Sequence, residues 1–174
     1  MLTSEIISQE TLFNLPENTE WVDGQLLEKN GVTFQHSKIQ SRLDYFWRNY
    51  MIAHNLGGEV CVEVPCRTLQ QIRRPDVAYI TQDLLEQFGE FNTLPQSFPL
   101  VAEVASPTDL IEDFLAKAEE YLEASCAEVW LIIPKVKYIL ILTEDQFLRF
   151  KSGEVAKTQK VLPEFSLVVD ELFK

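Results

Sequence analysis

A single carboxylate inside an otherwise apolar strand constrains this chain more than any other feature. Residues 100 to 105 are apolar on both faces of a strand except at Glu103. A strand that is apolar on both faces is normally covered on both sides, as in the middle of an α/β sheet. An unpaired carboxylate is costly there, so Glu103 must be paired, hydrogen-bonded or bound to a cation.

The segment after this strand has the periodicity of a helix. Between residues 109 and 122, apolar residues recur three and four positions apart, which predicts a helix with one buried stripe. Ser106 is the expected N-cap of this helix. Asp113 and Lys117 are four positions apart and share one side of it. We therefore expect Lys117, at the edge of the buried stripe, to face Glu103.

Strand and helix patterns alternate along the rest of the chain. Strands are expected at 59–64, 75–80, 99–105, 128–133, 138–142 and 147–150, and helices at 8–15, 36–55, 83–88 and 109–122. The Asp23-Gly24 pair predicts a hairpin over 20–28. The strand–helix–strand order over 99–133 predicts one α/β domain over residues 1–174, with a three-layer core of a mixed β-sheet flanked by helices. The hairpin and the C-terminal strands are expected to extend that sheet.

Charge and composition limit the expected partners. The 27 acidic and 15 basic residues give a net charge of -12, which disfavours nucleic acid because phosphate contacts need lysine and arginine. No apolar run approaches the ~20 residues that span a bilayer, so no membrane partner is expected. Three cysteines, an odd count without a paired framework, favour reduced thiols and a cytoplasmic protein.

Two short motifs on neighbouring predicted strands carry a family resemblance. Pro75-Asp76 and then Glu103-Val104-Ala105, in this order of elements, make the chain similar to the PD-(D/E)XK nuclease superfamily. More narrowly, it resembles the small stand-alone proteins labelled restriction endonucleases, a family of largely unknown function. The resemblance covers nearly the whole chain and implies a restriction-endonuclease-like fold. The superfamily's lysine position holds Ala105 here, and the resemblance points to Lys117 on the next helix instead.

The resemblance also implies a reaction and a cofactor. Asp76 and Glu103 correspond to the metal-binding acids, and the Val104 carbonyl could add a ligand for Mg²⁺ or Mn²⁺, which prefer oxygen donors. The ion would lower the pKa of a bound water, and Lys117 would orient that water or stabilise charge on the phosphate. The expected activity is Mg²⁺-dependent hydrolysis of DNA phosphodiester bonds without a covalent enzyme intermediate. A homodimer is expected from the same resemblance and from the aromatic-rich helix over 39–51.

Five further residues are candidates for supporting roles. Glu20 and His36 match family positions near the site, and Asp113 shares the helix side of Lys117. Arg73 and Arg74, next to the Pro-Asp strand, could hold a flanking phosphate. Simpler roles are also open: Glu20 could pair across its hairpin, His36 could mark a helix start, and the arginines could be solvated charges.

Two alternatives to an active nuclease are open at the level of sequence. Glu103 could be neutralised by a structural ion pair with Lys117 or an arginine. The net charge of -12 and Ala105 at the usual lysine position favour a catalytically inactive nuclease-fold module that binds or assembles with partners. A nuclease subunit that needs a basic partner to engage DNA is an intermediate alternative.

Overall fold

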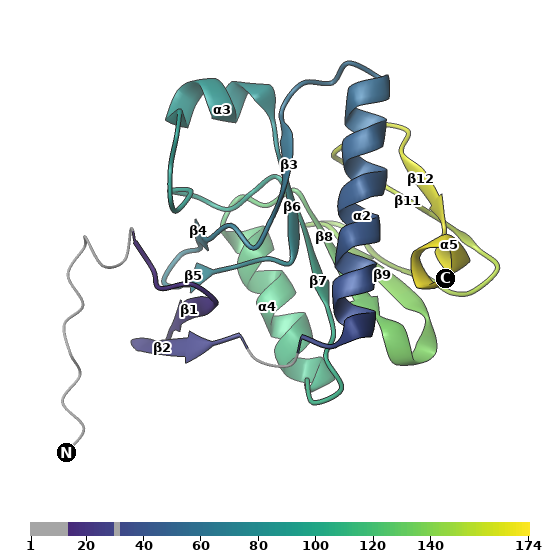
Figure 1. Cartoon of the computed structure of the whole chain (residues 1–174), viewed down its shortest axis with the longest axis horizontal. Helices are drawn as coiled ribbons and strands as arrows, with labels where there is room; N and C mark the ends of the chain where they lie inside the picture. Colours follow the sequence, from purple (N-terminus) through teal and green to yellow (C-terminus); the bar gives the residue numbers. More distant parts are fainter. Residues whose placement is uncertain (1–13, 30–31) are drawn as a thin grey trace.

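The computed structural model describes residues 14–29 and 32–174 (Figure 1). Most of the helix predicted at 8–15 therefore lies outside the described residues. The helices are α2 (Phe34–Ala53), α3 (Gln82–Phe88), α4 (Ile111–Glu123) and α5 (Val169–Phe173), with the 3₁₀ helix η1 (Pro134–Val136). The strands are β1 (Thr19–Val22), β2 (Gln25–Glu28), β3 (Glu59–Val62), β4 (Cys66–Arg67), β5 (Ile72–Arg73), β6 (Val77–Ile80), β7 (Leu100–Val104), β8 (Glu128–Ile133), β9 (Tyr138–Leu142), β10 (Phe147–Phe150), β11 (Val155–Lys157) and β12 (Ser166–Val168). Within the described ranges, no helix has the length and apolar character needed to cross a membrane.

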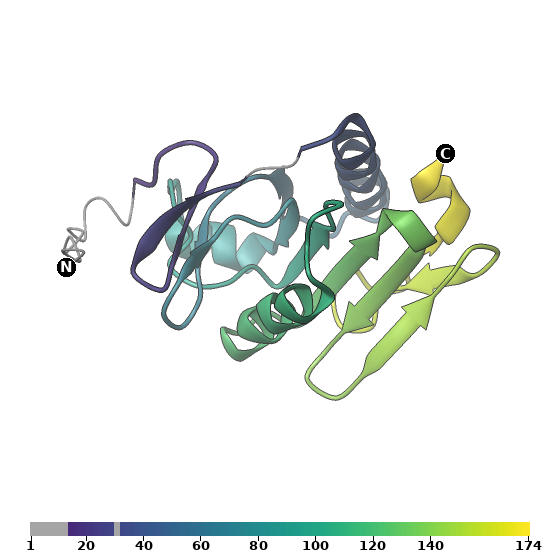
Figure 2. The ribbon, with the colours of Figure 1, turned by 90° about the horizontal axis from the view of Figure 1, so that it is seen from below.

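A six-stranded sheet in the order β10-β9-β8-β7-β6-β3 forms the centre of the fold. β7 and β8 are parallel and the other neighbours are antiparallel, so the predicted mixed sheet is confirmed. The parallel pair follows from the β7–α4–β8 crossover, in which the helix carries the chain back to the starting end of the sheet. α2 and α4 cover opposite faces of the sheet (Figure 2), which confirms the three-layer α/β architecture.

Buried side chains on the two faces of the sheet form two separate cores. On the α2 side, Trp47 meets Trp130 edge to face, with 5.7 Å between the ring centroids. On the α4 side, Phe114 packs in a cluster with Val101. Burial of such large apolar side chains is the main favourable contribution to folding. Because both faces of β7 are covered, Glu103 is only 4% exposed.

The N-terminal hairpin corrects one sequence prediction, because it does not extend the central sheet. β1 and β2 pair as predicted, but they belong to a separate four-stranded sheet of order β2-β1-β5-β4. β1 joins β5 where Trp21 lies opposite Ile72. At the other end of the chain β9 and β10 extend the central sheet as predicted, whereas β11 and β12 form a hairpin of their own.

The start of α4 corrects a second prediction, because Ser106 is not its N-cap. The Ser106 N–H donates to Asp109 Oδ2 at 2.8 Å, and the Asp109 N–H donates to the Ser106 carbonyl at 3.2 Å. These two bonds close a turn before the helix. The helix then begins at Ile111, with Leu110 at the N-cap position and no side-chain cap.

The aromatic residues of α2 make contacts inside the chain. Trp47 is fully buried, and the Tyr50 hydroxyl donates to the Pro163 carbonyl at 2.7 Å. Tyr45, by contrast, is 60% exposed. α2 thus uses Trp47 and Tyr50 inside the chain and leaves Tyr45 exposed, and the homodimer stays a prediction.

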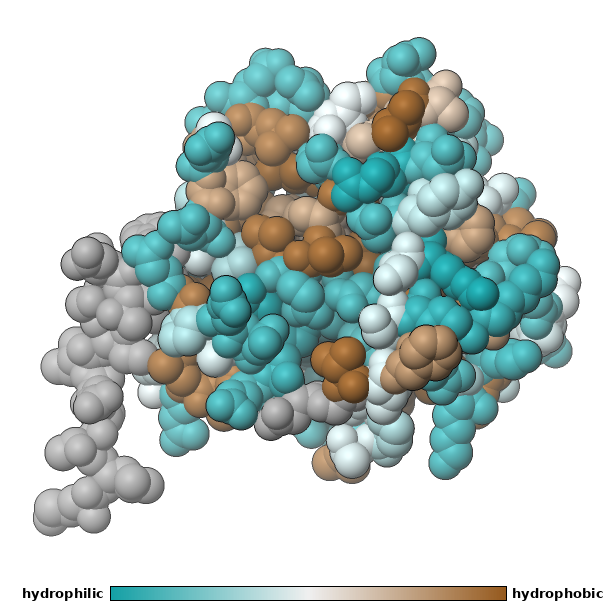
Figure 3. All heavy atoms as spheres, in the orientation of Figure 1, coloured by the Kyte–Doolittle hydropathy of each residue, from teal (hydrophilic) through white to brown (hydrophobic). Residues whose placement is uncertain are grey.

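The face in Figure 3 is largely hydrophilic, with a hydrophobic hollow beneath α3. The hollow is lined in part by Cys61, Val64, Ile80, Leu85 and Phe91. Its lining contains none of the residues that the sequence singles out for function. The predicted site residues gather instead at the junction of the central sheet, the small sheet and α4.

Gly58, just before β3, provides a test of the close contact between β3 and β6. Its φ is +81°, and a Cβ there would lie 2.2 Å from the Ile80 carbonyl oxygen. Gly153 has a similar φ of +86° but open space around it. We expect Gly153→Ala to lower the free energy of unfolding by about 1 kcal/mol, the cost of a left-handed backbone. Gly58→Ala should cost clearly more in urea denaturation, because the carbonyl must also move; equal losses would contradict the close approach.

Candidate functional site

Two buried carboxylates lie side by side at the end of the central sheet. Val77 on β6 is opposite Ala102 on β7, so the next pair outward is Asp76 and Glu103. Asp76 is 2% exposed and Glu103 is 4% exposed. The antiparallel register of two adjacent strands therefore brings together the two acids that the sequence predicted as metal ligands.

Asp76 is held by three hydrogen-bond donors. Its Oδ1 accepts from Lys29 Nζ at 2.8 Å. Its Oδ2 lies 3.1 Å from His36 Nε2 and accepts from the Val104 N–H at 2.7 Å. His36, predicted as an auxiliary residue, thus touches a predicted ligand directly. Val104 contacts Asp76 through its amide, while the predicted metal-binding role of its carbonyl stays a prediction.

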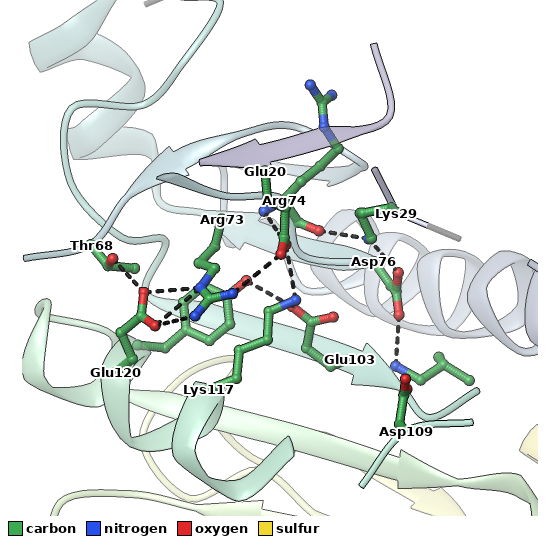
Figure 4. A network of polar contacts seen from close by, with 12 residues as sticks. Glu20, Lys29, Thr68, Arg73, Arg74, Asp76, Glu103, Asp109, Lys117 and Glu120 are labelled. Carbon is green, nitrogen blue, oxygen red and sulfur yellow. Dashed lines mark hydrogen bonds and ion pairs between the residues drawn. The ribbon is translucent and has the colours of Figure 1, made fainter. Parts of the chain in front are cut away.

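Glu103 faces the next helix, as its position in an apolar strand required. Lys117 Nζ lies 2.8 Å from Glu103 Oε1, and the Tyr121 hydroxyl donates to the same oxygen at 2.7 Å. Lys117 and Tyr121 are one helical turn apart on α4. Figure 4 shows the Lys117 side chain directed toward Glu103. The predicted meeting of Lys117 and Glu103 is confirmed, and both contacts use Oε1.

Glu20 on β1 completes the group from the small sheet. Its Oε1 accepts from Lys117 Nζ at 2.9 Å and from the Arg74 N–H at 2.9 Å. Its other oxygen lies 3.4 Å from Arg73 Nη1. Lys117 therefore bridges Glu20 and Glu103 (Figure 4), and Glu20 contacts the site rather than its hairpin partner strand.

The two arginines differ from each other in position. Arg73 faces the site, but its guanidinium is held by Glu120 at 2.5 Å and by Glu20. Arg74 is buried, and its guanidinium donates to the carbonyls of Thr19, Glu63 and Pro16. Figure 4 shows the Arg74 side chain turned away from Glu103 and Lys117. The Arg74 guanidinium thus binds main-chain carbonyls, and its predicted phosphate contact stays a prediction.

A cavity of about 730 Å³, here called the acidic cavity, is lined by residues that include Asp76, Glu103 and Lys117. Asp113, the last predicted auxiliary residue, is exposed on its wall. Apart from His36, the basic residues that line the acidic cavity are Lys29, Arg73 and Lys117, and each forms an ion pair. Its eight carboxylates are those of Glu20, Asp23, Glu28, Asp76, Glu103, Asp109, Asp113 and Glu120. The cavity therefore has an excess of negative charge.

Burial and pairing give the two strand carboxylates different acidities. Burial raises the pKa of Glu103 to about 7, although the charge of Lys117 acts in the opposite direction. Burial also opposes ionisation of Asp76, but the His36 hydrogen bond and the charge of Lys29 outweigh it and hold its pKa well below the usual range. Burial acts against the charge of Lys117, and the carboxylates Glu103 and Glu20 raise its pKa in spite of it. Asp76 is therefore the stronger acid of the two, and Glu103 the weaker.

The donor set fits a hard divalent cation better than a soft one. Asp76 and Glu103 offer carboxylate oxygens on one wall, and magnesium typically binds proteins through one or two carboxylates while keeping several waters. Across the described ranges, no group of three or more His, Cys, Asp or Glu side chains is arranged to hold a metal ion. The residues therefore fit an ion that keeps much of its water and not a closed zinc-type site.

Sequence reasoning missed Lys29 as part of this site. Lys29 follows β2 and reaches Asp76, Glu63 at 2.9 Å and the Arg74 carbonyl at 2.7 Å. Gln40 on α2 donates to Glu63 and to the Asp76 carbonyl. A lysine at the end of an exposed hairpin has no local feature that separates it from a solvated one. The buried Asp76 was the available signal, because it required a cation from elsewhere.

Removing Lys117 should destabilise the fold, because two buried carboxylates would lose a cation. We expect Lys117→Met to lower the free energy of unfolding by about 3 kcal/mol, as for other broken buried pairs. Adding Glu103→Gln should recover part of this loss, because it removes one of the two unpaired carboxylates, and the other, Glu20, still has Arg73 as a cationic partner. Urea denaturation measures both, with Lys160→Met, which breaks the exposed pair with Asp145, as a control that changes little. A double variant no more stable than Lys117→Met would contradict the ion pair.

His36 should make stability depend on pH. Burial lowers its pKa, but the hydrogen bond and charge of Asp76 outweigh burial, so its pKa is raised above 6.5. The folded state then holds the proton more tightly, and the resulting stabilisation is full below pH 6.5 and disappears as pH rises through the folded pKa. Thermal unfolding of wild type and His36→Gln should differ most at the acidic end. If the difference in stability between wild type and His36→Gln grew toward alkaline pH, the pKa of His36 would be lowered in the folded state and not raised.

Comparisons with known proteins agree with this arrangement. The profile of the Uma2 family, described as "Putative restriction endonuclease", matches residues 7–170. The fold is also similar to that of a solved protein from Anabaena variabilis, described as "a putative nuclease belonging to DUF820". The TM-score is 0.83 at 19% sequence identity, over 96% of this chain and 97% of that chain, and at this identity the likeness shows a shared fold. No curated protein matches the chain. Because the family profile extends over nearly the whole sequence, this chain belongs to the Uma2 family of restriction-endonuclease-like proteins.

Proposed function

We propose that this chain is a metal-dependent nuclease that hydrolyses the phosphodiester bonds of DNA. One observation carries the proposal: Asp76 and Glu103 lie opposite each other on neighbouring strands of one cavity, with Lys117 Nζ 2.8 Å from Glu103. Membership of a family described as restriction endonucleases supports the class of reaction. Two carboxylates and an ammonium group on one concave surface suit a reaction in which negative charge builds up on a phosphate.

Asp76 and Glu103 would hold Mg²⁺ or Mn²⁺, with the Val104 carbonyl as a further oxygen donor. When bound, such an ion polarises a phosphate oxygen and lowers the pKa of a coordinated water. The His36 and Lys29 contacts keep Asp76 ionised, which a ligand for a hard cation requires. Burial disfavours the charged form of Glu103, and metal binding would favour it.

Lys117 is the proposed catalytic cation. Its ammonium group would stabilise the charge that develops on the phosphate as water attacks phosphorus and the bond to the leaving oxygen breaks. The products are a phosphate monoester and an alcohol, without a covalent enzyme intermediate. Glu20 and Glu103 hold Lys117 Nζ at 2.9 and 2.8 Å, so Glu20 is a positioning residue.

The charge of the acidic cavity favours a second candidate within the same class. Its eight carboxylates outnumber its three basic groups, and each of these lysine and arginine side chains is already paired. Phosphate contacts normally come from lysine and arginine that are free to pair. A basic partner subunit could supply them, in which case the isolated chain would bind metal but cleave DNA slowly.

Calorimetric titration with Mn²⁺ tests the metal site directly. We expect Asp76→Asn and Glu103→Gln to weaken Mn²⁺ binding by at least about tenfold, because each removes a charged ligand. Glu119→Gln, which changes an exposed acid on the same helix as Lys117, is the matched control and should bind like wild type. Circular dichroism verifies that each variant is folded.

Cleavage of DNA with Mn²⁺ tests the reaction. We expect Lys117→Met to keep Mn²⁺ binding but to lose about 100-fold or more in rate, the usual effect of removing one group that stabilises transition-state charge. Unchanged Mn²⁺ affinity in both carboxylate variants would remove the proposed metal site. Metal binding without cleavage, restored by a basic partner, would favour the second candidate.

A further inference from the structure

A second cavity of about 500 Å³ lies beside the acidic cavity and differs from it in character. Its walls are mostly apolar, so it is called here the apolar cavity. Its apolar lining comes from Ala105, Pro107, Ile111, Phe114, Ile133 and Pro134. Ile111 is 53% exposed, so this apolar surface is open to solvent and is not part of the closed core. None of the proposed catalytic roles uses these residues.

The two cavities share part of their walls. His36, Ser106, Asp109 and Phe114 line both of them, so the Ser106–Asp109 turn borders each. His36 Nε2 is also 3.1 Å from Asp76 Oδ2. The apolar cavity therefore adjoins the residues proposed to hold the reacting phosphate.

The charges around the apolar cavity differ from those of the acidic cavity. Its lining has one carboxylate, Asp109, which accepts a hydrogen bond from the Ser106 N–H. It has one lysine, Lys135, which is exposed and forms no ion pair within the described part of the chain. By contrast, each lysine and arginine of the acidic cavity is paired. Lys135 is thus the cation at this site that is available to a substrate phosphate.

The apolar cavity has the size and the chemistry of a nucleoside site. Small-molecule sites have volumes of roughly 300–1,000 Å³, with apolar walls and a few polar groups. A nucleobase has apolar faces, which suit the proline and isoleucine walls, and a polar edge. Gln35 and Thr33 border the same cavity, and amide and hydroxyl groups are common partners for base edges.

We propose that the apolar cavity receives one unpaired nucleotide of the substrate strand, next to the phosphate that is cut, with Lys135 on the adjoining phosphate. This inference rests on the proposed nuclease function and specifies its substrate class. A base inside a duplex is stacked on both faces and cannot enter a pocket unless it leaves the stack. The preferred substrate is therefore a single strand, a loop or a frayed end rather than a continuous duplex.

Equilibrium binding without cleavage tests this inference separately from the reaction. Fluorescence anisotropy with a short labelled single-stranded DNA, and with the duplex formed from it, would be measured with Ca²⁺ in place of Mg²⁺ or Mn²⁺, since Ca²⁺ also takes oxygen ligands, and at low ionic strength, where phosphate contacts are strongest. We expect wild type to bind the single strand at least about tenfold more tightly than the duplex, as unstacked bases gain contacts that paired bases lack.

Substitutions at two exposed residues of the apolar cavity then test the cavity itself. Ile111→Ser removes apolar wall and Lys135→Ala removes the free cation, and each should weaken single-strand binding at least about fivefold. Lys157→Ala, an exposed lysine on β11 that lines neither cavity, is the charge-matched control and should leave binding unchanged. Because Lys135 is exposed and unpaired, its variant should fold like wild type.

The outcomes separate this inference from the proposed function. Equal or tighter duplex binding, no binding to either DNA, or unchanged affinity in both cavity variants would overturn the nucleotide site. If Mn²⁺-dependent cleavage persists in that case, the nuclease proposal stands alone. Cavity-dependent binding of the single strand without cleavage would instead support the nucleotide site and count against the nuclease.

Discussion

The contact of Lys117 with both Glu103 and Glu20 joins the parts of this molecule that build the site. Glu103 comes from the central sheet, Glu20 from the small sheet, and Lys117 from α4. A carboxylate buried between two covered faces is tolerated only with a cation and hydrogen bonds. Lys29, at the end of the hairpin, neutralises Asp76 in the same way that Lys117 neutralises Glu103. The need to neutralise two strand acids therefore fixes the hairpin and the helix against the strands that they flank.

Much of the fold could be predicted because strand and helix periods are local properties. The apolar runs at β7 and β8 and the stripe of α4 specify a crossover unit, and the structure contains it. Which sheet the hairpin joins is not determined by its local sequence. It depends on a single pairing of Trp21 with Ile72 and on side-chain bonds such as that of Glu20 to the Arg74 N–H. Neither contact can be predicted from the alternation of apolar and polar residues in the hairpin itself.

The candidate site could be predicted where a charge lies in an environment that makes it costly. Glu103 in an apolar strand and Lys117 at a buried helix edge are such charges, and they meet at 2.8 Å. Arg74 and Lys29 could not be separated in this way. Both are basic residues near turns, yet the Arg74 guanidinium donates hydrogen bonds to three main-chain carbonyls, whereas Lys29 reaches Asp76. Which of them faces the cavity follows from long-range packing, which local patterns do not specify.

The acidic cavity places a physical condition on any nuclease built on this site. Its paired lysines and arginine cannot hold a polyanion without giving up carboxylates that then need other partners. A divalent cation meets both needs, because it neutralises carboxylates and attracts phosphate at the same point. Substrate binding and metal binding would then be coupled, each strengthening the other by the same free energy. The net charge of -12, which at first counts against a nucleic-acid substrate, becomes compatible with one that arrives together with its metal ion.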